Sequence, residues 1–242
     1  MKIIGHRGAR REAPENTLAG FRHLRALGVR AVEFDIQVSA DGKLVIIHDA
    51  ALDRTTSGKG SVSEYLATEL AALDACHVAF PDWPSGEGVP RLEDVLGLLP
   101  DFDHLELEVK AASAQDEAAV IARLPALWER FGLAGRARTT SFNPRYLQGI
   151  KDAAPHITRG FLFEENFAGD PVSTALSLGC TSLGPHQARC TPELVAAAHA
   201  AGLIVSTWTV NTRERARELA AMGVDGLITD VPTQALTWFA AG

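Results

Sequence analysis

Cysteine is scarce in this sequence, with three residues in 242: Cys76, Cys180 and Cys190. Their number and irregular spacing exclude a disulfide framework and a cysteine-rich zinc site. No apolar run reaches the ~18 residues that a membrane-spanning helix requires, and the first residues lack the apolar core of a secretory leader. These absences predict a cytoplasmic protein without stable membrane insertion.

Positive charge is also in short supply. The chain has 23 Lys and Arg against 30 Asp and Glu, which gives a net charge of −7. Because an acidic surface repels phosphate backbones, the composition predicts no nucleic-acid partner. A length of 242 residues suits one (β/α)₈ barrel or two smaller domains.

Strand-like and helix-like segments alternate along the chain. Several helical segments end in glycine, and each strand-like segment ends in a polar tip. The strand-like segments are the stretch at Ile3 and Ile4 and residues 31–38, 104–110, 137–142, 158–163, 180–186, 203–210 and 224–230. The helical segments are 14–28, 91–99, 113–131, 144–154, 171–178, 192–201, 212–222 and 232–241.

Residues 44–48 (LVIIH) break this alternation. Asp41-Gly42 before them is a strong hairpin signal, so this segment should run antiparallel and return His48 beside Asp35. The eight remaining strands predict an α/β fold, a closed (β/α)₈ TIM barrel, with an open doubly wound sheet as the alternative. We expect a single catalytic domain over residues 1–242, with a flap or small subdomain inserted after the second strand at about residues 37–90.

Acidic residues recur at alternate positions in two neighbouring strands. Residues two apart in a strand share a face, so Glu33 and Asp35 should both point into the barrel. In residues 104–110, Glu106, Glu108 and Lys110 should do the same. Four carboxylates at close range cannot all ionise unpaired, so a cation is expected among them.

Two kinds of cation are candidates. Lys110 and Arg7 would form an ion-pair network at the mouth of the barrel. Alternatively, Glu33, Asp35 and Glu108 would bind a divalent metal, and an all-oxygen ligand set favours Mg²⁺ or Ca²⁺ over zinc. In that case the basic residues are free to hold an anion.

Histidines and an aromatic residue stand at the predicted strand ends. His6 and His48 should face the same mouth, where a neutral imidazole can take a proton and a charged one can give one, as phosphodiester cleavage requires. Trp208 and Asn211 would wall and orient a small organic group, although ordinary packing is the alternative for Trp208. His186, at another strand end, stays open.

Seven motifs in order along the chain resemble the glycerophosphodiester phosphodiesterase family. They are HRG…PENT (6–17), EFDIQVSADGKLVIIHD (33–49), LDRTTSGKG (52–60), ELEVK (106–110), TSF (140–142), TWTVN (207–211) and GVDGLITD (223–230). The resemblance implies a TIM barrel with a segment inserted after the second strand. It also implies metal-dependent hydrolysis of glycerophosphodiesters, such as glycerophosphocholine or glycerophosphoethanolamine, to sn-glycerol 3-phosphate and an alcohol.

The resemblance also implies roles for individual residues. His6 and His48 are the general acid/base pair, and Glu33, Asp35 and Glu108 are the metal ligands. Arg7 and Lys110 contact the phosphate, and Glu15 and Asn16 support the substrate-binding mouth. Glu106 departs from the family pattern, which often has a neutral residue such as Asn, and would tighten the metal or pair with Lys110.

Two other functions remain open on the sequence. A related phospholipase-type enzyme would act on lysophospholipid or inositol lipid head groups. A non-enzymatic protein on the same scaffold would bind a sugar phosphate or a metal, since a fold does not guarantee chemistry. The preferred alcohol, the order in which the histidines act and the formation of a homodimer are not determined by the sequence.

Overall fold

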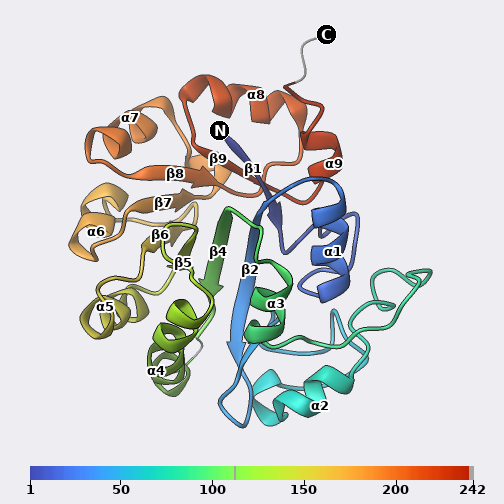
Figure 1. Ribbon diagram of the computed structural model, residues 1–242. Helices are drawn as coiled ribbons and strands as arrows, with labels where there is room; N and C mark the ends of the chain where they lie inside the picture. Colours follow the sequence, from blue (N-terminus) through green and yellow to red (C-terminus); the bar gives the residue numbers. More distant parts are fainter. Residues whose placement is uncertain (112, 240–242) are drawn as a thin grey trace.

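Eight parallel strands close into a barrel with helices around its outside, in a computed structural model that describes residues 1–111 and 113–239 (Figure 1). β1 pairs with β9 on one side and with β2 on the other, which closes the sheet. The parallel strands are β1 Lys2–His6, β2 Ala31–Val38, β4 His104–Val109, β5 Ala137–Ser141, β6 Arg159–Phe163, β7 Ser182–Pro185, β8 Ile204–Thr207 and β9 Gly226–Thr229. The predicted TIM barrel is confirmed.

The helices pack on the outer face of the barrel. They are α1 Leu18–Ala26, α3 Leu92–Leu98, α4 Ala114–Arg130, α5 Pro144–Ala153, α6 Pro171–Ser177, α7 Pro192–Ala200, α8 Arg213–Met222 and α9 Pro232–Ala235, with a short η2 Gln187–Arg189 before α7. No helix in the described ranges is long and apolar enough to cross a membrane.

Two predicted helix ends are wrong. α1 begins at Leu18 rather than near Glu15 or Asn16, because the Thr17 side chain accepts a hydrogen bond from the Gly20 amide and caps the helix. α9 ends at Ala235 rather than at 241, because Thr237 and Trp238 donate to carbonyls only three residues back, as in a turn. Residues 240 and 241 of that prediction lie outside the described ranges.

The segment after β2 is an insertion into the barrel. β3 (Leu44–Ile46) pairs antiparallel with β2, as the hairpin signal predicts, and Gly42 in the turn has a φ of 70°. A 3₁₀ turn, η1 (Val62–Glu64), and α2 (Ala67–Ala72) follow, next to a small apolar cluster of their own. Figure 1 shows this segment in cyan beside the barrel.

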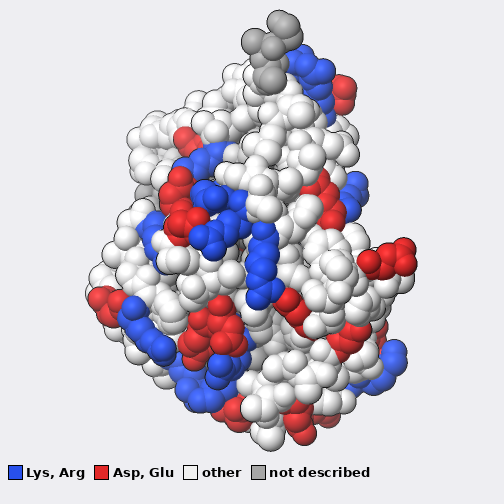
Figure 2. Space-filling view, turned by 45° about the vertical axis from the view of Figure 1, so that its right-hand side comes forward, with Lys and Arg blue, Asp and Glu red and all other residues white. Residues whose placement is uncertain are grey.

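Alternation within the strands sorts apolar from acidic residues. Phe34 of β2 and Leu107 of β4 belong to the main core, and both are fully buried. The residues that alternate with these apolar ones along each strand, such as Glu33 and Glu108, line a cavity inside the barrel. The predicted inward face of both strands is therefore confirmed. On the outside, basic and acidic side chains are interspersed over the face that Figure 2 shows.

The three cysteines are free and buried, which yields a prediction about reactivity. Burial raises the pKa of all three thiols, to about 11 for Cys180 and Cys190. Only the thiolate form reacts, so native protein at pH 7.5 should react far more slowly than denatured protein with a disulfide reagent such as DTNB. In the denatured protein all three thiols should react. Rapid reaction of any of the three thiols in the native protein would contradict their burial.

Candidate active site

A cavity of about 170 Å³ opens among the carboxyl ends of the barrel strands. On one side it is lined from β1, β2 and β4, and from β3's end by His48. The rest of the wall comes from β5, β6, β8 and β9, of which β5 is next to β4 and β6 lies across the barrel from β1. The lining residues are His6, Arg7, Arg10, Glu33, His48, Glu106, Glu108 and Lys110 on the first side, and Thr140, Phe142, Leu162, Glu164, Trp208, Thr209 and Ile228 around the rest.

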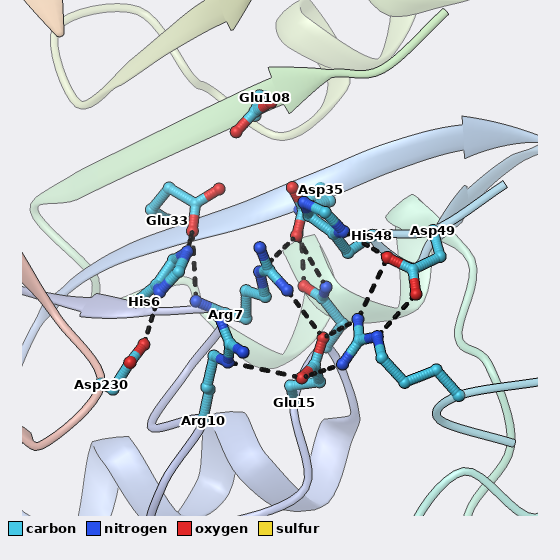
Figure 3. Close-up of polar contacts among 12 residues, drawn as sticks. His6, Arg7, Arg10, Glu15, Glu33, Asp35, His48, Asp49, Glu108 and Asp230 are labelled. Atoms are coloured by element: carbon cyan, nitrogen blue, oxygen red, sulfur yellow. Dashed lines mark hydrogen bonds and ion pairs between the residues drawn. The ribbon is translucent and has the colours of Figure 1, made fainter. Parts of the chain in front are cut away.

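His6 is held by a buried carboxylate. Its Nδ1 lies 2.6 Å from Oδ1 of Asp230, which follows β9, and the other Asp230 oxygen accepts a hydrogen bond from Asn211 at 2.8 Å. Because a carboxylate only accepts, the Nδ1–H of His6 donates, and Nε2 faces Glu33, 3.8 Å from Oε2 (Figure 3). Burial lowers the pKa of His6, although the Asp230 bond opposes this.

His48 is held in the same way at its own Nδ1. Asp49 Oδ1 lies 2.5 Å from that atom, and Arg54 in turn binds Asp49 and Glu15 (Figure 3). The Arg54 hydrogen bonds are the main reason that the pKa of Asp49 falls to about 2. Burial lowers the pKa of His48 against the raising effect of nearby Asp35. The two histidines thus line one cavity, each with a carboxylate on Nδ1.

Three inward carboxylates form a cluster beside the histidines. One oxygen each of Glu33, Asp35 and Glu108 lies within 4.8 Å of the others, and all three residues are buried. The strand register brings them together, because Asp35 of β2 is paired with Glu108 of β4. The sequence-predicted metal ligands are therefore adjacent.

The cations near the cluster do not neutralise it fully. Lys110 Nζ lies 3.2 Å from Asp35 Oδ1 and also pairs with Glu108, and Arg7 Nε lies 3.1 Å from Asp35 Oδ2. Burial opposes ionisation of Asp35, but Lys110 and Arg7 outweigh it and lower the Asp35 pKa. Burial and the neighbouring carboxylates raise the pKa of Glu33, and burial raises that of Glu108 to about 7. The predicted ion-pair network exists, but it centres on Asp35.

The cluster suits a hard divalent ion. Glu33 Oε1, Asp35 Oδ1 and Glu108 Oε1 are buried and accept no hydrogen bond of good geometry from the described residues, although Lys110 is within ion-pair distance of two of them. A bound cation would reverse the repulsion that raises the pKa of Glu33. Three buried carboxylate oxygens form the donor set that Mg²⁺ or Ca²⁺ prefers.

Three residues that were predicted at the mouth of the barrel hold other site residues in place through hydrogen bonds. Glu15 Oε1 accepts from Arg7 Nη1 at 2.9 Å, and Asn16 Nδ2 donates to Asp35 Oδ2 at 2.8 Å. Asn16 has a φ of 56°, an unusual conformation that brings its amide to Asp35. Asn211 binds Asp230 through its side chain. These three are not among the described residues that line the cavity, and each binds a charged residue of the site instead.

Trp208 lines the cavity as predicted. Its Nε1 donates to the Gly184 carbonyl at 2.9 Å, and its ring packs edge-on against Phe142 at 5.4 Å between centroids. The Phe142 ring also lies beside the acidic cluster, 5.8 Å from Lys110 Nζ. His186 packs against the Trp208 ring, its Nδ1 lies 3.0 Å from Glu165, and it is not among the described residues that line the cavity.

Glu106 has a partner that sequence reasoning did not identify. His104 Nε2 lies 2.8 Å from Glu106 Oε1, and the predicted pairing of Glu106 with Lys110 is wrong because Lys110 pairs with Asp35 and Glu108. His104 and Glu106 share the inner face of β4 one pleat below the cluster. Burial opposes ionisation of Glu106, but His104, Arg138 and Ser206 together outweigh it and lower the Glu106 pKa.

Asp230, Asp49 and Arg10 are site residues that the prediction missed. Asp49 directly follows His48 in the sequence. Asp230 is the polar residue at the end of the last strand, and this position could have identified it as a site residue. Arg10 lines the cavity and has a half-exposed guanidinium. Arg10 lies in the turn after β1, where the sequence has no strand or helix period from which the direction of its side chain could be predicted.

The fold and the site together define a class of protein. Paired imidazoles, each held by a carboxylate, stand beside an acidic cluster and two cations at the carboxyl ends of TIM-barrel strands. This is an arrangement for acid–base cleavage of a bound anion, since proton acceptor, proton donor and positive charge meet in one cavity.

Similar proteins define the class more narrowly. The chain is 35% identical over 231 residues to a glycerophosphodiester phosphodiesterase of Caldanaerobacter subterraneus subsp. tengcongensis, which covers 95% of this chain and 94% of the relative. A crystal structure of the glycerophosphodiester phosphodiesterase of Agrobacterium tumefaciens superposes with a TM-score of 0.83 at 32% identity, over 96% of this chain and 97% of that one. An Oleispira antarctica phosphodiesterase in complex with its product sn-glycerol 3-phosphate has a TM-score of 0.91 at 29% identity, over 100% and 97%.

Residues 6–234 match the glycerophosphoryl diester phosphodiesterase family, and the chain belongs to that family. It is accordingly a phosphoric diester hydrolase that acts on glycerophosphodiesters. The match includes every residue of the cavity and of the supporting network described above.

Proposed function

We propose that the protein hydrolyses soluble glycerophosphodiesters such as glycerophosphocholine and glycerophosphoethanolamine to sn-glycerol 3-phosphate and an alcohol, in a single catalytic domain. The observation that carries the proposal is the pair His6 and His48. Each has its Nδ1 against a carboxylate, and both line the cavity of the acidic cluster. The Oleispira relative with bound sn-glycerol 3-phosphate supports the product.

The phosphate group would be bound by a metal ion and by two basic side chains. Glu33, Asp35 and Glu108 would hold Mg²⁺ or Ca²⁺, and the bound ion supplies positive charge for the diester oxygens. Arg7 and Lys110 are the phosphate contacts among the protein's own side chains, because both cations line the cavity beside the cluster. Glu15 and Asn16 keep Arg7 and Asp35 in place.

The two imidazoles move the protons. Because Nδ1 of each ring is engaged, Nε2 is the atom through which each would exchange a proton with substrate. One ring in the neutral form takes the proton of the attacking oxygen. The other, protonated, gives a proton to the leaving alkoxide, so that the alcohol departs neutral. Trp208 and Phe142 form an apolar wall for the organic part of the substrate.

A panel of diesters tests this proposal. Purified protein is chelated, supplied with Mg²⁺ or Ca²⁺, and given glycerophosphocholine, glycerophosphoethanolamine or a micellar lysophospholipid. Release of the head-group alcohol is measured for all three, because a cleaved lysophospholipid keeps its acyl chain on the glycerol phosphate, and sn-glycerol 3-phosphate is measured as well for the two soluble diesters. We expect release from the two soluble diesters. Faster turnover of micellar lipid would replace the proposal with the phospholipase-type reaction, and saturable binding without product would replace it with a non-catalytic binder.

Asp230 is expected to position His6 for its role. In Asp230→Asn the side chain keeps its shape but loses the charge that holds the Nδ1–H tautomer, so kcat should fall roughly 10-fold or more while KM changes little. Asp103→Asn is a control, because it removes only an exposed pair with Lys2. An unchanged kcat in a folded Asp230→Asn protein would remove Asp230 from the mechanism.

A further inference from the structure

Arg10 is a cation of the cavity that the proposed reaction does not use. It lies in the turn after β1, where its backbone amide donates to the His6 carbonyl at 3.3 Å, and its side chain lines the cavity. The guanidinium group makes no hydrogen bond to any residue in 1–111 or 113–239, and its Nε lies 3.7 Å from Glu15 Oε2 (Figure 3). Its positive charge is therefore only weakly paired.

Glu15 does not hold Arg10 more closely because two other guanidinium groups already bind it. Arg7 Nη1 and Arg54 Nη2 both donate to Glu15 Oε1 at 2.9 Å, and Arg54 Nη1 donates to Oε2 at 2.9 Å. Arg7 and Arg54 each have a second carboxylate partner, whereas no second carboxylate of the described residues lies within ion-pair distance of Arg10. An anion beside Arg10 would relieve the repulsion among the three guanidinium groups.

The other cations that line the cavity in the described part of the chain are bound by carboxylates. Lys110 pairs with Asp35 and Glu108, and Arg7 pairs with Asp35, so both lie beside the acidic cluster, where the phosphate would bind. In Figure 3, Arg10 lies farther from the acidic cluster than Arg7 does. The Arg10 side chain is also half-exposed, which places its charge at the rim of the cavity.

The substrate can carry negative charge in only two places. The glycerol arm is uncharged, and the phosphate has Arg7, Lys110 and a bound ion as partners, so a cation at the rim suits a negative group on the alcohol. Glu164, an exposed carboxylate of the cavity lining, follows β6 across the barrel from β1 and attracts an ammonium group. An alcohol with a carboxylate and an ammonium group is an amino acid, such as serine.

We propose that Arg10 makes the protein selective for glycerophosphodiesters whose alcohol is an amino acid, such as glycerophosphoserine. The Arg10 guanidinium donates two parallel hydrogen bonds to the carboxylate of the alcohol, the geometry in which a guanidinium binds a carboxylate most strongly. This inference rests on the proposed function and deepens it, because it names the alcohol that the site selects.

The test compares glycerophosphoserine with glycerophosphoethanolamine, which differ only in the carboxylate. The values of kcat/KM for both are measured with Mg²⁺ present, for the unaltered protein, Arg10→Gln and Arg10→Lys. We expect the unaltered protein to prefer glycerophosphoserine. Arg10→Gln should lower the ratio of the two kcat/KM values roughly 10-fold, because it removes a charge-assisted hydrogen-bonded pair. Arg10→Lys should keep part of the preference, since Lys keeps the charge but not the planar fork.

Glu164→Gln is a matched control from the same cavity. Both alcohols carry an ammonium group, so this variant should leave the ratio of the two kcat/KM values unchanged. Added salt should weaken the preference of the unaltered protein, because a half-exposed charge is screened. An unchanged ratio in Arg10→Gln would mean that Arg10 serves the phosphate or the fold, and would overturn the proposal. A preference of the unaltered protein for glycerophosphoethanolamine, or an equal fall of the ratio in Glu164→Gln, would overturn it as well.

Binding is measured separately from turnover. Dissociation constants of the two diesters are determined by calorimetry in a His48→Ala background, in which cleavage is too slow to consume them, with and without Arg10→Gln. We expect Arg10→Gln to weaken glycerophosphoserine roughly 10-fold relative to glycerophosphoethanolamine. Diester cleavage without this preference removes the role of Arg10 alone, whereas preferential binding of glycerophosphoserine without cleavage by the unaltered protein removes the proposed reaction alone.

Discussion

Replacing His6 or His48 by Ala should lower kcat for glycerophosphocholine by about 100-fold or more. Each change removes one of the two proton-transfer groups in the cavity, and a positioned general acid or base contributes at least this much to such a reaction. The double variant should lose little more than the worse single variant, because the two groups act on one transition state. Steady-state kinetics with detection of sn-glycerol 3-phosphate measures both.

The matched control is His156→Ala. His156 is exposed and its Nε2 lies 3.2 Å from Glu129, away from the residues that line the cavity. Its kcat should equal that of the unaltered protein. Near-normal turnover in His6→Ala or His48→Ala, with the same melting temperature, would take that histidine out of the mechanism.

Removal of divalent ions should abolish turnover, and Mg²⁺ or Ca²⁺ should restore it. Glu33→Gln should weaken binding of the restoring ion by at least roughly 10-fold, because it replaces a charged ligand atom with a neutral one. Glu33 has a raised pKa from burial and from neighbouring carboxylates, so its charged form opposes folding of the metal-free protein near neutral pH. Glu33→Gln should therefore keep or raise the melting temperature without ions while it lowers the stabilisation that added ions give.

Calorimetry of ion binding provides a measure that is independent of turnover. Glu129→Gln serves as a control, since it changes an exposed carboxylate outside the cluster. Full activity in the presence of excess EDTA, or unchanged ion affinity in Glu33→Gln, would show that the cluster does not bind a metal. The buried Lys110–Asp35–Glu108 ion pairs would then be the function of these carboxylates.

The barrel was predictable because its signals are local. The two-residue period in residues 31–38 and 104–110 follows from the pleat of a strand, and the same period decides that Glu33 and Glu108 face inward. Asp41-Gly42 reversed the chain as expected and brought His48 to the cavity. Helix ends were predicted less well, because capping by Thr17 and the turn after Ala235 depend on single hydrogen bonds.

The partners of the site residues were not predictable in this way. His6 and Asp230 are separated by 224 positions, and they meet only because β9 closes the barrel against β1. The hydrogen bond from the Asn211 amide to Asp230 also depends on closure of these strands. Glu106 pairs with His104 of its own strand rather than with Lys110. His104 is two residues away on the same face of the strand and therefore close, whereas Lys110 pairs with Asp35.

The sequence by itself determined the strand and helix alternation, the inward set of acidic residues and the identity of the two histidines at strand ends. Those features follow from periodicity and from the polarity of neighbouring residues. Only the tertiary structure decided which carboxylate holds each imidazole and which cations pair with Asp35. Each of these depends on barrel closure and strand register, which bring together residues that are distant along the chain.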